Sequence, residues 1–377
     1  MKAKYLFLFL ILSFSCKEKY MPDIHVPAAG FLVVEGFINV GNGATNISLT
    51  RTSSLDSPAV IPQTGAQVEV QSENGSVYPL FENGPGKYTI DQIPADPSQN
   101  YRLDIRMANG KEYVSDYSAY KSTPEIDSVN WNASPDNIYI YVNTHDDKNQ
   151  TLYYQWQFAE TWEYHSAYFS TIVYQDHEIK FRQPEDYFYT CWQSDVSTSI
   201  AIASSAKLQS DIISEQLLTT IPFRTNNKFG IRYSILVKQY ALSRDWYEWI
   251  EKVKKNTEQL GTIFDAQPSE TGGNFHCVSD PAETVIGFVG CTSETEKRIF
   301  IEGTSIPLAT LPNGYEQCTI DTIPYTPEDL ERVLSGPNPI PISEISFMGV
   351  ITGVAVASAD CVDCRDKGGV NIKPDFW

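Results

Sequence analysis

Basic residues are scarce in this 377-residue sequence. It contains 28 Lys and Arg against 47 Asp and Glu, which gives a formal charge of −19, and two of its few lysines, Lys2 and Lys4, fall in the first 15 residues. A surface with this excess of carboxylates repels the phosphates of nucleic acids. The composition therefore excludes nucleic acid as a partner.

The motifs of the common enzyme classes are missing as well. No H-E-x-x-H pair, G-x-S-x-G elbow, P-loop or strand-linked G-x-G-x-x-G occurs, and the five histidines are scattered. Glu160 and Glu163 are three residues apart, so on a strand they point to opposite faces and cannot by themselves form the carboxylate pair of a glycosidase. The sequence predicts a protein that is not an enzyme and that has no cofactor.

The apolar run near the N-terminus is too short to cross a bilayer. It covers about ten residues from Leu6, whereas a membrane-spanning helix needs ~20. Behind a short basic start, such a run is typical of the signal peptide that we predict over residues 1–15. The small Ser15 and then Cys16 follow, as in a bacterial lipobox, so we expect the Cys16 thiol to be lipidated. The alternative is plain secretion with an incidental cysteine.

Residues 16–29 are predicted to form a lipidated tether. They contain Pro22 and Pro27 and have no apolar period. The residues Lys17, Glu18 and Lys19 resemble the tag that follows the lipidated cysteine in surface-exported lipoproteins of the Bacteroidota. At ~3.3 Å per residue the tether spans up to roughly 40 Å. We expect a chain that is anchored in the outer membrane and faces the cell exterior.

Six cysteines remain if Cys16 is lipidated. An even number of cysteines in a chain that passes through an oxidising compartment predicts disulfides. Cys277 and Cys291 flank a strand-turn segment and are expected to close a hairpin, so the other four would pair among themselves. The six candidates are Cys191, Cys277, Cys291, Cys318, Cys361 and Cys364.

Two segments offer partial metal-binding patterns. Cys361 and Cys364 form a C-x-x-C motif, but zinc needs two further ligands and no second such motif exists. A thioredoxin-like role would need a βαβ context that is missing here. Asp146 and Asp147 could contact calcium, although a loop between strands is commonly acidic because it is solvated. We predict no metal site.

Residues 30–122 read as short strands broken by turns. Asn-Gly pairs at Asn74, Asn83 and Asn109 suit tight hairpins, and inward residues alternate, as at Val68 and Val70. About seven such strands predict an Ig-like or prealbumin-like β-sandwich. Such a domain is either a spacer for assembly or a ligand-binding module.

Residues 123–377 are predicted to form a larger β-rich domain. On the long strand after Thr151, the period of two places Glu160 in a row of aromatic side chains that includes Trp156 and Trp162. A carboxylate there must be paired, hydrogen-bonded or protonated. Either Glu160 is a core residue answered by Arg232 or Lys238, or Trp156, Glu160 and Trp162 contact a ligand, or Glu160 is catalytic.

Two helices are predicted within this larger domain. One covers residues near 244–260, where Ser243 can cap the start and Gly261 the end. The other covers residues near 327–335, with Thr326 as the N-cap and Pro327 in the first turn.

Several stretches together resemble one known family. They include "FLVVEGFIN", "GKYTI", "YYQWQFAETWEY", the block from Tyr233 to Phe275 and the ending "DCVDCRDKGGVNIKPDFW". The chain is similar to the domain of unknown function 4249 family of Bacteroidota lipoproteins, in which no reaction is established. The resemblance implies a surface partner of a TonB-dependent outer-membrane receptor, because members are often found beside such receptors.

We therefore expect a surface-exposed outer-membrane lipoprotein that assists a TonB-dependent receptor in ligand uptake or envelope assembly. The alternative is a free-standing ligand-binding or adhesive lipoprotein, whose groove would be the aromatic row around Trp156 and Trp162. A hydrolase would rest on Glu160 and scattered acids.

Overall fold

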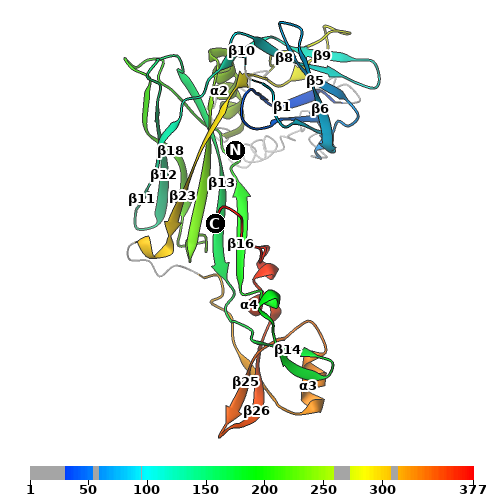
Figure 1. Ribbon diagram of the computed structural model, residues 1–377, viewed down its shortest axis with the longest axis vertical. Helices are drawn as coiled ribbons and strands as arrows, with labels where there is room; N and C mark the ends of the chain where they lie inside the picture. The colour runs from blue at the N-terminus through cyan, green and yellow to red at the C-terminus, as the bar shows by residue number, and fades with distance from the viewer. Residues whose placement is uncertain (1–29, 54–58, 95, 259–271, 307–312) are drawn as a thin grey trace, which may run out of the picture.

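The computed structural model describes residues 30–53, 59–94, 96–258, 272–306 and 313–377. Within these ranges the chain is mainly β, as predicted. The molecule is elongated, and three β units follow one another along its long axis (Figure 1). We call them the upper domain, the middle sandwich and the distal module. Among the described residues, no helix is both long and apolar enough to span a membrane.

The upper domain is built from thirteen strands that are linked by hydrogen bonds. β6 pairs with β5 on one side and with β7 on the other, and so connects the two halves of the domain. Val68 and Val70 are fully buried, as their alternation predicts. The first ten strands are β1 (Leu32–Gly36), β2 (Ile38–Asn39), β3 (Thr45–Arg51), β4 (Ile61–Pro62), β5 (Gln67–Ser72), β6 (Val77–Gly84), β7 (Lys87–Ile90), β8 (Asn100–Arg106), β9 (Glu112–Ser115) and β10 (Ser118–Lys121).

The last three strands of the upper domain come from far along the chain. They are β20 (Phe275–Cys277), β21 (Val285–Ile286) and β22 (Cys291–Thr292). β22 lies between β2 and β10 and is parallel to both, and Val285 and Val289 join the same apolar core. The prediction that all of 123–377 forms one C-terminal domain is therefore wrong for this segment. Strands of two or three residues are too short to show a period, so the sequence does not reveal which sheet they complete.

The middle sandwich consists of two antiparallel sheets that enclose the largest apolar core. One sheet contains β11 (Ile126–Ala133), β12 (Asn137–His145) and β18 (Ile212–Pro222). The other contains β13 (Tyr153–His165), β16 (Thr190–Val196), β17 (Ala201–Ser204), β19 (Arg232–Ala241) and β23 (Glu294–Glu302), and β23 is followed by the 3-10 helix η3 (Gly303–Ser305). Side chains of β12 meet those of β13 and β19 between the sheets. This is the packing that alternating strands predict.

The distal module lies at the opposite end of the molecule from the upper domain (Figure 1). Its strands are β14 (Ile172–Gln175) and β15 (Glu178–Phe181), which form a hairpin, and β24 (Asp321–Pro324), β25 (Ile340–Phe347) and β26 (Val350–Ala357), which form a three-stranded sheet. Its short helices are η2 (Pro184–Asp186), α3 (Pro327–Leu334) and α4 (Ala359–Val362), and the 3-10 helix η4 (Cys364–Lys367) follows the module. Two small apolar clusters fill its interior. A core this small stabilises a fold only weakly, so the module needs further stabilisation, such as disulfides.

Both predicted helices are present. α2 (Arg244–Glu258) begins where Ser243 Oγ accepts the backbone N–H of Trp246 at 3.2 Å. Its predicted end at Gly261 lies outside the described residues. In α3, Thr326 is the N-cap and accepts the N–H of Asp329, and Pro327 occupies the first turn. Local capping chemistry was therefore sufficient to locate both starts.

Helix α2 packs at the junction between the upper domain and the middle sandwich. Trp246 and Ile250 lie in an apolar cluster with Phe37 and Phe288 of the upper part. Gly290 lies against the indole of Trp246, and a Cβ placed there would be 2.1 Å from the ring. A glycine is therefore required for this close approach.

Gly290→Ala is expected to destabilise the protein by about 1–3 kcal/mol, because the added methyl group forces Trp246 out of its position. Urea unfolding followed by tryptophan fluorescence measures the change. Gly336→Ala is the matched control, since a Cβ at Gly336 meets open space. Equal stability of the two variants would show that the junction does not depend on this contact.

Candidate functional site

Cys16, the predicted lipidation site, lies outside the described residues. Its modification therefore stays a prediction, as do the signal peptide and the tether.

Four of the six other cysteines form disulfides. Cys191 on β16 pairs with Cys364 on η4, and Cys318 pairs with Cys361 on α4. The first bond joins the middle sandwich to the segment that follows the distal module, and the second closes the module on itself. The C-x-x-C motif is thus divided between two different bridges, which are structural and not a metal or redox pair.

Cys277 and Cys291 do not pair, so the predicted hairpin closure is wrong. Both are buried free thiols in the upper domain, where β20 pairs with β9, and β22 lies between β2 and β10. The two strands are therefore not neighbours in a hairpin. Burial raises the pKa of the Cys291 thiol well above its usual range. Cys291 acts as a small apolar group in the core, whereas the Cys277 thiol donates to Glu283 Oε2 at 3.8 Å.

The aromatic row of β13 is part of the core and not a groove. Trp156 is fully buried and Trp162 is 6% exposed. Trp156 Nε1 donates to Gln239 Oε1 at 2.8 Å, and Gln239 Nε2 donates to the Pro124 carbonyl oxygen at 2.8 Å. The prediction that Trp156 and Trp162 contact a ligand is therefore wrong, because period-two alternation here marks the inward face of a sandwich.

Glu160 is a buried carboxylate whose partners are within the chain. It accepts hydrogen bonds from Lys228 Nζ at 2.7 Å and from the Tyr233 hydroxyl at 2.6 Å. Burial, together with the Glu160 charge, raises the pKa of Tyr233 well above its usual range. The Lys228 ammonium also lies 4.6 Å from the centroid of the Trp162 ring. Glu160 is thus a satisfied core residue.

The expected partners of Glu160, Arg232 and Lys238, pair elsewhere. Arg232 contacts Glu302 at 2.8 Å, and Lys238 contacts Glu294 at 2.7 Å. Glu160 is opposite Ile235 in the β13–β19 register. Since Arg232 and Lys238 are each an odd number of residues from Ile235, their side chains lie on the other face of the sheet.

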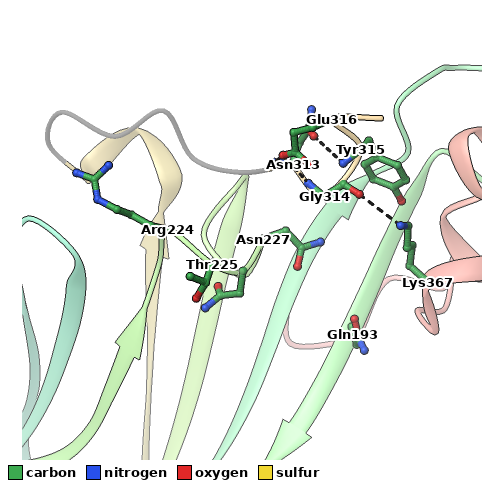
Figure 2. Close-up of a pocket in the computed structure, with 10 residues that line it drawn as sticks. Gln193, Arg224, Thr225, Asn227, Asn313, Gly314, Tyr315, Glu316 and Lys367 are labelled. Atoms are coloured by element: carbon green, nitrogen blue, oxygen red, sulfur yellow. Dashed lines mark hydrogen bonds between the residues drawn. The ribbon is translucent and has the colours of Figure 1, made fainter. Parts of the chain in front are cut away.

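A polar pocket of about 650 Å³ lies between the middle sandwich and the segments that flank the distal module. Figure 2 shows side chains from the β18–β19 loop, from β16, from the turn after residue 312 and from η4. The lining residues are Gln193, Arg224, Thr225, Asn226, Asn227, Asn313, Gly314, Tyr315, Glu316 and Lys367. Their separation in the sequence left no local pattern by which sequence analysis could have found them.

Most of the polar groups in this pocket are already engaged. Arg224 pairs with Asp136 at 2.7 Å, and Glu316 accepts backbone N–H groups from its own turn. Within the described ranges, the carboxamides of Gln193 and Asn227 make no hydrogen bond. Free amides beside cations suit hydroxyl or anionic groups of a polar ligand.

The acidic loop considered for calcium is organised by its own backbone. The Asp146 carboxylate accepts N–H groups from Lys148, Gln150 and Thr151, each at 2.9 Å. Among the residues that the structure describes, no group of three or more His, Cys, Asp or Glu side chains is arranged to hold a metal ion. Asp146 therefore acts as a turn-forming residue.

His145, next to this loop, is expected to titrate above its ordinary pKa. Its Nδ1 lies 2.8 Å from the Asp127 carboxylate, and this hydrogen bond, together with the Asp127 charge, raises the pKa above 6.5. The pair therefore stabilises the folded state fully below pH 6.5. This stabilisation is lost as the pH rises through the raised pKa of His145. An NMR titration should show the pKa falling in Asp127→Asn and falling less in the control Asp147→Asn. An unchanged value in Asp127→Asn would contradict the assignment.

A second accessible feature is the end of the β25–β26 hairpin. Phe347 is 66% exposed, Met348 89% and Val350 65%. The hairpin end lies farthest from the upper domain (Figure 1). The sequence does not reveal this exposed end, because an apolar run does not show whether its side chains are covered.

The sequence profile of a domain of unknown function, DUF4249, matches residues 17–298. The chain belongs to the DUF4249 family. This confirms the family predicted from the sequence. A search of curated proteins finds no match.

Solved structures similar to parts of this DUF4249 chain are distant. The chicken interferon gamma receptor alpha chain is 11% identical, with a TM-score of 0.15 over 56% of this chain and 90% of that chain. A candidate carbohydrate-binding protein from Bacteroides uniformis is 11% identical, with a TM-score of 0.16 over 56% of this chain and 90% of that chain. Scores this low carry no argument about function.

Proposed function

We propose that this chain is a non-enzymatic lipoprotein of the outer membrane. It is anchored through Cys16, faces the cell exterior and serves as an accessory partner of a TonB-dependent receptor in ligand uptake or envelope assembly. The lipobox-like start, the tag at Lys17, Glu18 and Lys19 and the family resemblance motivate the location and the partner.

The observation that carries the proposal is that the candidate catalytic carboxylate is buried, whereas the exposed features are surfaces suited to binding. Glu160 is the carboxylate on which a hydrolase would rest according to the sequence. It is buried and accepts hydrogen bonds from Lys228 and Tyr233. The accessible features are instead the polar pocket and the apolar hairpin end. A stack of β units with such surfaces suits binding to another molecule better than turnover.

Affinity purification of the full-length chain from outer membranes in mild detergent, with mass spectrometry of the retained proteins, tests the proposal. We expect a TonB-dependent barrel in an amount comparable to the chain itself. Cys16→Ser is the control, because this chain should leave the membrane and lose the barrel. Repeated recovery of the acylated wild-type chain alone would contradict the proposal.

The second candidate is a free-standing ligand-binding lipoprotein. Its original support, an exposed groove at Trp156 and Trp162, is removed by their burial. The polar pocket gives it a different basis, in the unengaged amides of Gln193 and Asn227. Binding to a glycan array that disappears in Gln193→Ala/Asn227→Ala, with no barrel retained by the wild-type chain, would favour this candidate.

A further inference from the structure

The β25–β26 hairpin ends in four apolar side chains that the described part of the chain leaves wholly or partly exposed. Phe347, Met348, Val350 and Ile351 are 66%, 89%, 65% and 38% exposed, respectively. They are separated only by Gly349, and the hairpin projects at the tip of the distal module (Figure 1). Single exposed apolar residues are ordinary, but a contiguous group on a projection marks an interaction site.

The residue at the hairpin turn breaks a local rule. Phe347 pairs with Val350, so Met348 and Gly349 form a two-residue loop, and their φ values are 49° and 81°. Positive φ at both positions is the turn type that favours Asn-Gly, whereas methionine has a side chain that disfavours it. In the same module, the two-residue turn of β14–β15 uses the polar residues Asp176 and His177. A methionine at such an unfavourable backbone position indicates that its side chain has a function, because locally unfavourable residues are concentrated at functional sites.

The hairpin is presented on a fixed base. Thr171 N–H donates to the Ile342 carbonyl oxygen at 2.9 Å, and Ser170 Oγ donates to that of Pro341 at 2.6 Å. The Cys318–Cys361 bond closes the module a few residues beyond β26. A projection that is already ordered loses little entropy on binding.

The charges around the hairpin favour a protein over an anionic bilayer as its occupant. Residues 340–357 contain one charged side chain, Glu344, and no Lys or Arg. Elsewhere in the module the cations Lys180 and Arg332 are paired with Asp176 and Asp329, and the Arg182 guanidinium donates to Ser170 Oγ and lies over the Phe188 ring. Loops that insert into anionic lipid surfaces usually bring free cations with them.

We propose that the β25–β26 hairpin is the docking element of this protein, and that Phe347 and Met348 enter an apolar recess with a neutral or basic rim on a partner protein. This inference rests on the proposed function and names the surface by which the receptor would be held. Phenylalanine is a common anchor of protein interfaces, and the flexible methionine adapts to the shape of a recess.

The test compares two double variants of the full-length, lipid-anchored chain. Phe347→Ser/Met348→Asn removes the two proposed anchor side chains and leaves an Asn-Gly turn, so the hairpin fold is favoured. Val60→Ser/Phe81→Ser is the matched control, because Val60 and Phe81 of the upper domain are 82% and 69% exposed. Thermal unfolding confirms that both variants are folded. The amount of barrel retained from outer membranes is then measured by quantitative mass spectrometry.

We expect the hairpin variant to retain at least about ten-fold less barrel than the wild-type chain, and the control to retain as much as the wild type. Equal retention by the hairpin variant would overturn the docking inference and leave the proposed function standing. If the wild-type chain retains no barrel, the proposed function fails, and photocrosslinkers placed at positions 348 and 60 decide the inference. A crosslink from position 348, and not from position 60, to one identified outer-membrane protein in an amount comparable to the chain supports it. Crosslinks to lipid, or to nothing, overturn it.

Discussion

Replacing Cys191 and Cys364 with serine is expected to lower the free energy of unfolding by about 3–5 kcal/mol. These cysteines are 173 residues apart, so their bond closes a long loop and removes much entropy from the unfolded chain. The bond also fastens η4 to β16, next to the polar pocket. Guanidinium unfolding of the wild type and of the double variant measures the loss.

The second disulfide provides the control. Cys318 and Cys361 are 43 residues apart, so the chain-entropy model gives their removal a cost that is smaller by about 1 kcal/mol. Hydrogen exchange should show faster exchange in the distal module for both pairs of replacements, and for Cys191→Ser/Cys364→Ser also in β16. An unchanged unfolding midpoint would contradict the structural role given to Cys191–Cys364.

Lys228→Met is expected to destabilise the middle sandwich by about 3–5 kcal/mol, because it leaves the Glu160 carboxylate buried without its cation. The side chains of Lys228 and Glu160 are only 19% and 9% exposed, and their atoms are 2.7 Å apart. Among the residues that the structure describes, Tyr233 then remains as the one hydrogen-bond donor to Glu160. Urea unfolding measures the change.

Two further variants separate the buried charge from the general loss of a lysine. Glu160→Gln/Lys228→Met should recover most of the lost stability, since no unpaired charge remains. Lys238→Met breaks the more exposed pair with Glu294 and is expected to cost about 1 kcal/mol or less. If Lys228→Met and Lys238→Met were equally mild, the ion pair at Glu160 would not be the buried link described here.

Local patterns predicted the elements of this fold well. The alternation on β13 correctly placed Trp156, Glu160 and Trp162 on one face, and Thr326 with Pro327 correctly marked the start of α3. These features depend on neighbours along the chain, so the sequence contains them directly.

Features that depend on distant segments were harder to predict. The partner of Glu160 is 68 residues away on a loop, and β22 lies between two strands, β2 and β10, from the start of the chain. The sequence analysis named Arg232 and Lys238 as partners of Glu160. Alternation along β19 excludes them only once the β13–β19 register, with Glu160 opposite Ile235, is known. The same holds for the row of tryptophans, whose burial required the second sheet of the sandwich.

The most direct test of the proposed function is the mass of the particle that contains this chain when it is released from native outer membranes in detergent. Native mass spectrometry should give a complex of one lipidated chain with one barrel-sized protein. A particle that contains only the lipidated chain, near the mass of the polypeptide, would contradict the proposal that the protein acts by holding a receptor.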